Sequence, residues 1–339
     1  MDIAFLIPGT YEERDPEKGL DDLLDVFEFG EDLGFRGGWV RQRHLEHAVS
    51  NALSFLAAAS QRTSRIELGT GVIQIGYENP FLLASNAALV DALSKRRLQL
   101  GVSGGVPARY DLLGPEVFGN NPPRPEELGY DKIGQLQSLL VGDYVGERPT
   151  EIEAPGTIQI ARIQPPHATL PDRLWQGGSS RGSAAFAAAH GLNFTTGNIV
   201  AGDGIHGFEE AQSAVLDVYE QGLPEGARTR VALGRVIVPT DSATTESREK
   251  YAALLASRLE RTLGPHGERD INFQPDLIGS AEEIVERLLT DPALSRASEL
   301  RLELPYEFTL DEYRQVLADF VEKVVPLARD AGLDLVVSE

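Results

Sequence analysis

The chain has 339 residues, of which 52 are Asp or Glu and 31 are Lys or Arg, and its formal net charge is −21. A strongly acidic chain repels the phosphates of nucleic acids and anionic membrane surfaces, so we expect neither as a partner. The sequence has no Cys, which excludes disulfides, thiolate metal sites and Cys nucleophiles.

The apolar pattern is that of a globular chain. Apolar residues make up 42% and charged residues 24% of the sequence. The first residues carry the acidic Asp2 and no long apolar stretch, so they do not read as a signal peptide. No apolar run approaches the roughly 20 residues that a membrane-spanning helix needs. We therefore expect a cytoplasmic protein.

Short strand-like runs alternate with amphipathic segments in the first half of the chain. Strands are expected at residues 3–7, 38–40, 66–73 and 98–102. Helical spacing of apolar residues is expected after them, from about 20 to 33, 51 to 63 and 80 to 94. Strand–helix units that repeat in this way indicate a parallel sheet.

The second half continues the alternation. Four more strands are expected at 173–176, 192–196, 231–238 and 299–304, and a hairpin within 144–163. Helices are expected at 182–190, 205–222 and 310–331, with at least two between 245 and 289. Eight strands followed by helices predict a (β/α)8 TIM barrel, and an open doubly wound sheet is the alternative. The absence of a composition break favours one barrel domain over 1–339, with insertions near 106–165 and 242–278.

A glycine-rich turn follows the fifth expected strand and precedes an Ala-rich helix. Its sequence is Gly177-Gly178-Ser179-Ser180-Arg181. Glycines allow close approach of a ligand, a Ser can cap the helix, and the helix N-terminus with Arg181 favours an anion such as phosphate. The alternative is a capped turn that binds nothing.

Two further turns lie where the active face of a barrel would be. Ser103 and Gly104 belong to a Gly-rich turn after the fourth strand, which alone is weak support for a site. Arg43 and His44 follow the second strand, and His44 is a candidate general acid or base, with a surface histidine as the alternative. We expect no metal site, because His44 and His47 have no evident third ligand.

Several segments, in this order, resemble the luciferase-like flavin monooxygenases, the bacterial luciferase superfamily. The most specific region is 57–105, with QRTSRIELGTGV at 61–72, NPFLLA at 79–84 and RLQLGV at 97–102. Residues 35–44, 174–191 and 278–283 also resemble motifs of the family. The resemblance spans most of the chain and is weakest from about 114 to 171.

The resemblance implies a barrel that binds flavin at the carboxyl ends of its strands. Gly177, Gly178, Ser179 and Ser180 would hold the flavin phosphate, and Arg181 would help to meet its charge. Trp175, just before this turn, would also belong to the cofactor site. Gly71 and Val72 would form a non-prolyl cis peptide beneath the isoalloxazine ring. Ser103 and Gly104 would line the ring or the ribityl chain.

One departure from the family pattern concerns catalysis. The family's Glu-His-His after the second strand is Gln42-Arg43-His44 in this chain. Arg43 stands where the often catalytic first His is found, and an arginine cannot act as a base at neutral pH. Arg43 would then hold an anionic group, and His44 would carry the acid–base chemistry.

These features together predict a flavin-dependent oxidoreductase. The leading hypothesis is a monooxygenase that uses reduced FMN and oxygen on a small organic substrate. Since no dinucleotide fingerprint is present, a separate flavin reductase would supply the reduced FMN. The alternatives are a deazaflavin-dependent dehydrogenase of the same fold, a non-catalytic flavin-binding or structural subunit, and a phosphate-binding isomerase. The small-residue runs at 57–59 and 84–88 suit close helix packing, within the barrel or in a homodimer.

Overall fold

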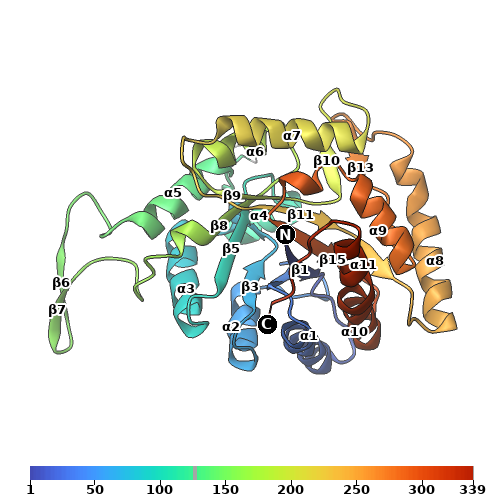
Figure 1. Ribbon diagram of the computed structural model, residues 1–339. Helices are drawn as coiled ribbons and strands as arrows, with labels where there is room; N and C mark the ends of the chain where they lie inside the picture. The colour runs from blue at the N-terminus through green and yellow to red at the C-terminus, as the bar shows by residue number, and fades with distance from the viewer. Residues whose placement is uncertain (125–127, 339) are drawn as a thin grey trace.

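The computed structural model describes residues 1–124 and 128–338 (Figure 1). Residues 125–127, which belong to the insertion expected near 106–165, and residue 339 lie outside the described residues.

Eight parallel strands form the centre of the molecule. In chain order they are β1 (Asp2–Ile7), β2 (Gly37–Val40), β3 (Glu67–Thr70), β5 (Leu98–Ser103), β8 (Leu174–Gly177), β9 (Asn193–Thr196), β11 (Val231–Arg235) and β15 (Glu299–Glu303). They pair in the order β3-β2-β1-β15-β11-β9-β8-β5, and Leu68 of β3 pairs with Leu98 of β5. This last pairing closes the sheet, so the predicted TIM barrel is confirmed and the open sheet is wrong.

Helices surround the barrel on the outside (Figure 1). They are α1 (Pro16–Asp32), α2 (Ala52–Arg62), α3 (Pro80–Leu93), α5 (Tyr130–Val141), α6 (Arg181–Ala189), α7 (Phe208–Gly222), α8 (Thr245–Leu259), α9 (Ala281–Thr290), α10 (Leu310–Asp319) and α11 (Val325–Asp330). Asn79, Ser180, Ser280 and Thr309 cap four of them with side-chain oxygens. Each cap satisfies N–H groups that the first helical turn leaves free.

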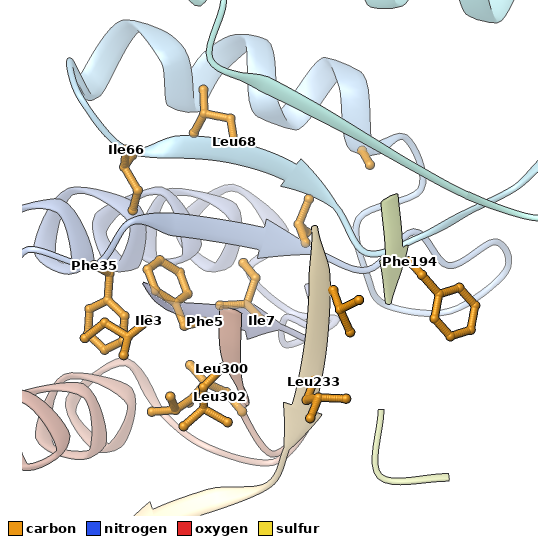
Figure 2. Packing of buried hydrophobic residues seen from close by; sticks show 14 of the residues in the cluster. Ile3, Phe5, Ile7, Phe35, Ile66, Leu68, Phe194, Leu233, Leu300 and Leu302 are labelled. Carbon is orange, nitrogen blue, oxygen red and sulfur yellow. The ribbon is translucent and has the colours of Figure 1, made fainter. Parts of the chain in front are cut away.

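The main hydrophobic core lies between the strands and this helical layer. Side chains of a strand alternate between its two faces, so Ile3, Phe5 and Ile7 of β1 point outward. Figure 2 shows them beside Leu300 and Leu302 of the adjacent β15, and all five are buried. The alternate residues of β1, Ala4 and Leu6, instead cluster with the two tryptophans inside the barrel.

The barrel interior is aromatic and charged. Trp39 of β2 and Trp175 of β8 meet edge to face with ring centroids 5.4 Å apart. The indole N–H of Trp175 donates to the Oε1 of Gln99 at 2.8 Å, and the Arg301 guanidinium carbon lies 3.5 Å from the Trp39 ring centroid. A Cβ on Gly69 would lie 2.1 Å from the Trp39 ring. Glycine at 69 therefore makes room for the indole.

The structure adds elements that sequence patterning did not predict. Helix α4 (Tyr110–Phe118) and helix α5 form within the insertion expected near 106–165. The expected hairpin is present as β6 (Glu151–Ala154) and β7 (Thr157–Ile160), and it projects away from the barrel (Figure 1). Near 242–278, β13 (Ile271–Phe273) pairs with β10 (Ile199–Ala201), and β14 (Leu277–Gly279) pairs with β12 (Ile237–Pro239).

Candidate active site

A cavity of about 450 Å³ opens at the carboxyl ends of the barrel strands. This is the end where barrel enzymes bind their ligands, because the loops that follow the strands converge there. The described lining residues are Leu6, Arg41, Arg43, Gly71, Val72, Gly177–Ser179, Thr195, Gly197–Ile199, Gly234, Val236, Arg258, Arg261, Arg301 and Glu303–Tyr306. The cavity is therefore lined by apolar side chains, by glycine backbone and by arginine side chains.

One wall of the cavity is the segment that follows β3. The Gly71–Val72 peptide bond is cis, as the family resemblance implied. Val72 packs against the turn after β8, since a Cβ on Gly177 would lie 2.8 Å from its Cγ1. Glycine at 177 thus lets two ligand-facing segments from β3 and β8 approach each other.

The turn after β8 leads directly into α6. Some of its N–H groups donate hydrogen bonds to other described residues, and others do not. The Ser180 hydroxyl accepts from the Ser183 N–H at 3.2 Å, and the Ser183 hydroxyl accepts from the Ser180 N–H at 3.1 Å. The Gly178 N–H donates to the Thr195 carbonyl at 3.0 Å. Ser180 and Gly178 are therefore committed to holding the turn.

The remaining donors of this turn are open. The N–H groups of Ser179, Arg181 and Gly182 donate to no residue within 1–124 and 128–338. They belong to the N-terminus of α6, where the helix dipole favours negative charge. Ser179 also lines the cavity. This corner can bind an anion through backbone donors. The Arg181 side chain does not line the cavity, because its Nη2 donates to the Asp203 carbonyl at 2.7 Å.

Besides Ser180 and Arg181, three further predicted cofactor residues do not line the cavity. Trp175 is fully buried inside the barrel, where Trp39 and Gln99 surround it. Gly104 faces α5, and a Cβ there would lie 2.8 Å from the Tyr130 ring. Ser103, at the end of β5, also does not line the cavity. Trp175 shares β8 with Gly177, and β5, which ends at Ser103, pairs with β8, so these residues lie near the turn but do not form the cavity wall.

The two predicted catalytic residues have different positions. Arg43 lines the cavity, and its Nη2 donates to the Tyr306 hydroxyl at 2.7 Å. His44 does not line the cavity: its ring contacts Tyr77 edge to face at 5.9 Å between centroids. The Nε2 of Gln42 lies 3.4 Å from the His44 Nε2. Arg43 is thus placed to touch a ligand, whereas His44 lies beside the cavity.

Several cavity residues were missed by sequence reasoning. Arg41 Nη2 lies 2.6 Å from the Oε2 of Glu303, which joins the ends of β2 and β15. Burial opposes the charged form of Arg41, but the Glu303 carboxylate outweighs it and raises the pKa of Arg41. Glu303 lies in the eighth expected strand, and Tyr306 follows that strand. Their place near its carboxyl end could have identified them as cavity residues from the sequence. Arg258 and Arg261, from α8 and the turn after it, gave no such signal.

The geometry defines a TIM barrel with a cavity at the carboxyl ends of its strands and open backbone N–H groups beside it. The profile of the luciferase-like monooxygenase family matches residues 1–293 of this chain. The chain therefore belongs to the luciferase-like monooxygenase family.

Individual relatives are similar over parts of the chain. It is 32% identical over 151 residues to 4-hydroxyprotoasukamycin monooxygenase of Streptomyces nodosus subsp. asukaensis, which covers 44% of this chain and 39% of that protein. It is 36% identical over 148 residues to limonene 1,2-monooxygenase of Rhodococcus erythropolis, which covers 43% and 37%. These two matches span well under half the length of either relative.

A relative of another kind matches more of the chain at lower identity. The F420-dependent glucose-6-phosphate dehydrogenase of Intrasporangium calvum is 25% identical over 288 residues, covering 81% of this chain and 83% of that protein. Among solved structures, the oxygenating constituent of 3,6-diketocamphane monooxygenase from Pseudomonas putida, in complex with FMN, has a TM-score of 0.69. That match has 14% identity and covers 96% and 99% of the two chains, so it shows the shared fold.

Proposed function

We propose that this chain is an FMN-dependent monooxygenase that oxidises a small organic substrate with reduced flavin from a separate reductase. The observation that carries the proposal is the set of open N–H groups at the start of α6, beside a cavity at the carboxyl ends of the strands that Gly177–Ser179 line. The family to which the chain belongs and its monooxygenase relatives support the same function.

The residues of the cavity fit a flavin mononucleotide. Its phosphate would accept from the open N–H groups of Ser179, Arg181 and Gly182 at the start of α6, as helix N-termini bind phosphates elsewhere. Gly177 and Gly178 let the turn pack against Val72 and Ser183, since Cβ atoms there would lie 2.8 Å and 2.2 Å from them, and this packing places the open donors beside the cavity. When bound, reduced FMN supplies the electrons that activate oxygen.

The rest of the lining suits a reaction that water would disturb. Leu6, Val72, Val236, Leu304 and Pro305 give the cavity an apolar surface that excludes water from the bound flavin and substrate. Arg43, held by Tyr306, presents a permanent positive charge at this surface. The acid–base role of His44 stays a prediction, since its ring lies beside the cavity and would have to act through Gln42 or a water.

Side-by-side cofactor titrations test the proposal. The folded protein is titrated with oxidised FMN, with reduced FMN under anaerobic conditions, and with the deazaflavin cofactor, and binding is followed by calorimetry. We expect FMN in at least one redox state to bind more tightly than the deazaflavin. Failure of both FMN forms to bind would end the proposal.

A deazaflavin-dependent dehydrogenase is the second candidate, because a relative with that activity aligns with 81% of the chain. The same titration separates the two: tighter binding of the deazaflavin would favour hydride transfer. A non-catalytic flavin-binding subunit would bind FMN yet convert none of a varied panel of substrates to an oxygenated product when a reductase is supplied.

We also propose that the protein is a cytoplasmic homodimer. Helix α3 exposes Leu82, Leu89 and Leu93, at 58%, 50% and 47% of their surface, on the helix that carries the small-residue run at 84–88. A second copy would remove this apolar surface from water. In the described part of the chain, no helix is long and apolar enough to cross a bilayer. Light scattering on the purified protein would give the oligomeric state.

A further inference from the structure

The cavity carries more positive charge than its own carboxylates balance. Among the described lining residues, five are arginine and one, Glu303, is acidic. Two of the arginines are balanced individually: Arg41 by Glu303 at 2.6 Å, and Arg301 by the buried Glu299 at 2.6 Å. The excess charge therefore resides on the other three.

Two of these three share a single carboxylate. Arg258 Nη1 lies 3.1 Å from one oxygen of Asp276, and Arg261 Nη2 lies 3.3 Å from the other. The Asp276 side chain is 1% exposed, so one buried negative charge faces two half-buried positive ones. One carboxylate cannot neutralise two guanidinium groups, and the pair keeps a net positive charge next to the cavity.

Arg261 shows the imbalance most directly. Its Nε is buried and finds no hydrogen-bond partner within residues 1–124 and 128–338. Burial, with the neighbouring Arg258 charge adding to it, lowers the pKa of Arg261 in spite of Asp276. The accessible part of the Arg261 side chain lines the cavity, where an anion would balance the charge that Asp276 leaves unmatched.

Arg43 adds a third guanidinium to the same cavity. Its Nη2 is held by the neutral Tyr306 hydroxyl at 2.7 Å, and none of the described carboxylates pairs with it. Tyr306 lines the cavity together with Arg43 and Arg258, and it lines an adjoining pocket with Arg258. The flavin phosphate has its own donors at the start of α6, on a turn that follows β8. Arg43, Arg258 and Arg261 are thus available to bind another anion.

We propose that Arg258 and Arg261, with Arg43 across Tyr306, form a subsite for an anionic group of the substrate, a carboxylate or a phosphate. The proposal rests on the proposed function in that the subsite adjoins the flavin. The substrate is then a small organic acid or phosphate ester whose anionic end is anchored by arginine while its apolar part faces Val236, Leu304 and Pro305.

Calorimetry with matched probes tests this subsite. Benzoate, phenyl phosphate and the neutral benzamide are titrated into the protein with and without FMN. We expect at least one anion to bind at least tenfold more tightly than benzamide. The benzoate and phenyl phosphate arms tell a carboxylate site from a phosphate site.

Single substitutions then locate the site. Arg258→Gln and Arg261→Gln each leave one arginine on Asp276, so the buried carboxylate keeps a partner. Each is expected to weaken the favoured anion at least tenfold, and Arg261→Lys, which keeps the charge, is expected to weaken it less. Arg329→Gln, at a side chain 57% exposed that pairs with Asp334, removes the same charge outside the cavity and should leave affinity unchanged.

Two outcomes would overturn the proposal. The first is anion affinity that is equal in the wild type and in both Gln variants. The second is a loss of FMN affinity in those variants without a loss of riboflavin affinity, because the arginines would then hold the flavin phosphate. If FMN does not bind but the arginine-dependent anion binding remains, the subsite stands and the proposed function fails.

Discussion

Arg301 and Trp39 form a cation–π contact inside the barrel, with the guanidinium carbon 3.5 Å from the ring centroid. Both side chains are buried, and the Arg301 Nη2 also lies 2.6 Å from Glu299. Burial lowers the pKa of Arg301, while the Glu299 carboxylate opposes that shift. Because Arg301 also lines the cavity, the charge network of the barrel interior continues into the floor of the candidate active site.

Arg301→Met should destabilise the fold. The change removes the positive charge that faces Glu299 and leaves that buried carboxylate with Arg230, 2.8 Å away, as its cationic partner. We expect the free energy of unfolding to fall by about 3 kcal/mol, as when one member of a buried ion pair is removed. Denaturant unfolding measures it. Arg329→Met, on the exposed surface, is the control and should change stability by less than about 0.5 kcal/mol. Equal stability of the two variants would contradict the expectation.

Gly178→Ala should weaken both the turn after β8 and flavin binding. A Cβ at 178 would lie 2.2 Å from the Ser183 hydroxyl, which accepts from the Ser180 N–H in the helix cap. Loss of a helix cap typically costs about 1 kcal/mol. We therefore expect a loss of stability of this size, with at least a tenfold loss of FMN affinity.

Gly182→Ala is the matched control for this turn. Its Cβ would meet no atom closer than the Ser180 hydroxyl at 3.9 Å. Thermal unfolding and FMN titration of both variants are compared with the wild type. If Gly182→Ala weakens FMN as much as Gly178→Ala does, close approach at position 178 is not what the site requires.

The sequence predicted the barrel well because its strands are short apolar runs bounded by Gly and Pro, and each expected strand matches an observed one. Helices α4 and α5 were missed for different reasons. Pro115 lies inside α4, and a proline within a segment argues against a helix. In α5 the buried Ile133, Leu136 and Leu140 do have helical spacing, but they lie in a segment that was interpreted as an insertion. Both are local patterns that weak similarity to known motifs obscured.

The candidate site was harder to predict because it depends on barrel closure. The turn at 177–179 could be identified, since its donors are adjacent in sequence. Trp175 was misplaced because the alternation of side chains along β8 turns it into the barrel interior. Arg261 lies more than 200 positions from Arg43, and only the fold brings them to one cavity. No pattern of residue spacing within a short segment could predict that these two side chains line the same cavity.

Glu31 should make stability depend on pH. Its carboxylate accepts from the N–H groups of Ser64, Arg65 and Ile66 at 2.6 to 2.9 Å, which fastens α1 to the start of β3. Burial acts to raise the pKa of Glu31, but these backbone donors outweigh it and lower the pKa. A lowered folded pKa means that this stabilisation is present above the unfolded pKa of about 4.3 and is lost as the pH falls through the folded value.

The Glu31→Gln variant tests this linkage. At pH 7 it should be less stable than the wild type by about 1.5–3 kcal/mol, the range for hydrogen bonds to a charged group. The difference should begin to shrink as the pH falls below about 4.3, where the carboxyl group of the unfolded chain takes up a proton, and should be lost below the lowered pKa of the folded state. Urea unfolding at a series of pH values gives both curves, and a difference that stays constant with pH would show that charge is not the cause.

Arg43 and His44 should contribute unequally to turnover. Arg43→Gln removes one of the guanidinium groups that line the cavity, whereas His44→Gln changes a ring that lies beside the cavity against Tyr77. Formation of oxygenated product is measured with reduced FMN supplied by a flavin reductase and with the small organic acid or phosphate ester that the wild type converts fastest. We expect Arg43→Gln to lower kcat/KM by about 10- to 100-fold, as for a lost charged hydrogen bond, and His44→Gln to lower it less. Tyr306→Phe, which removes the hydroxyl that positions Arg43 at 2.7 Å, should raise KM with a smaller change in kcat. A larger loss in His44→Gln than in Arg43→Gln would instead assign the acid–base chemistry to His44, with Gln42 or a water as the link to the cavity.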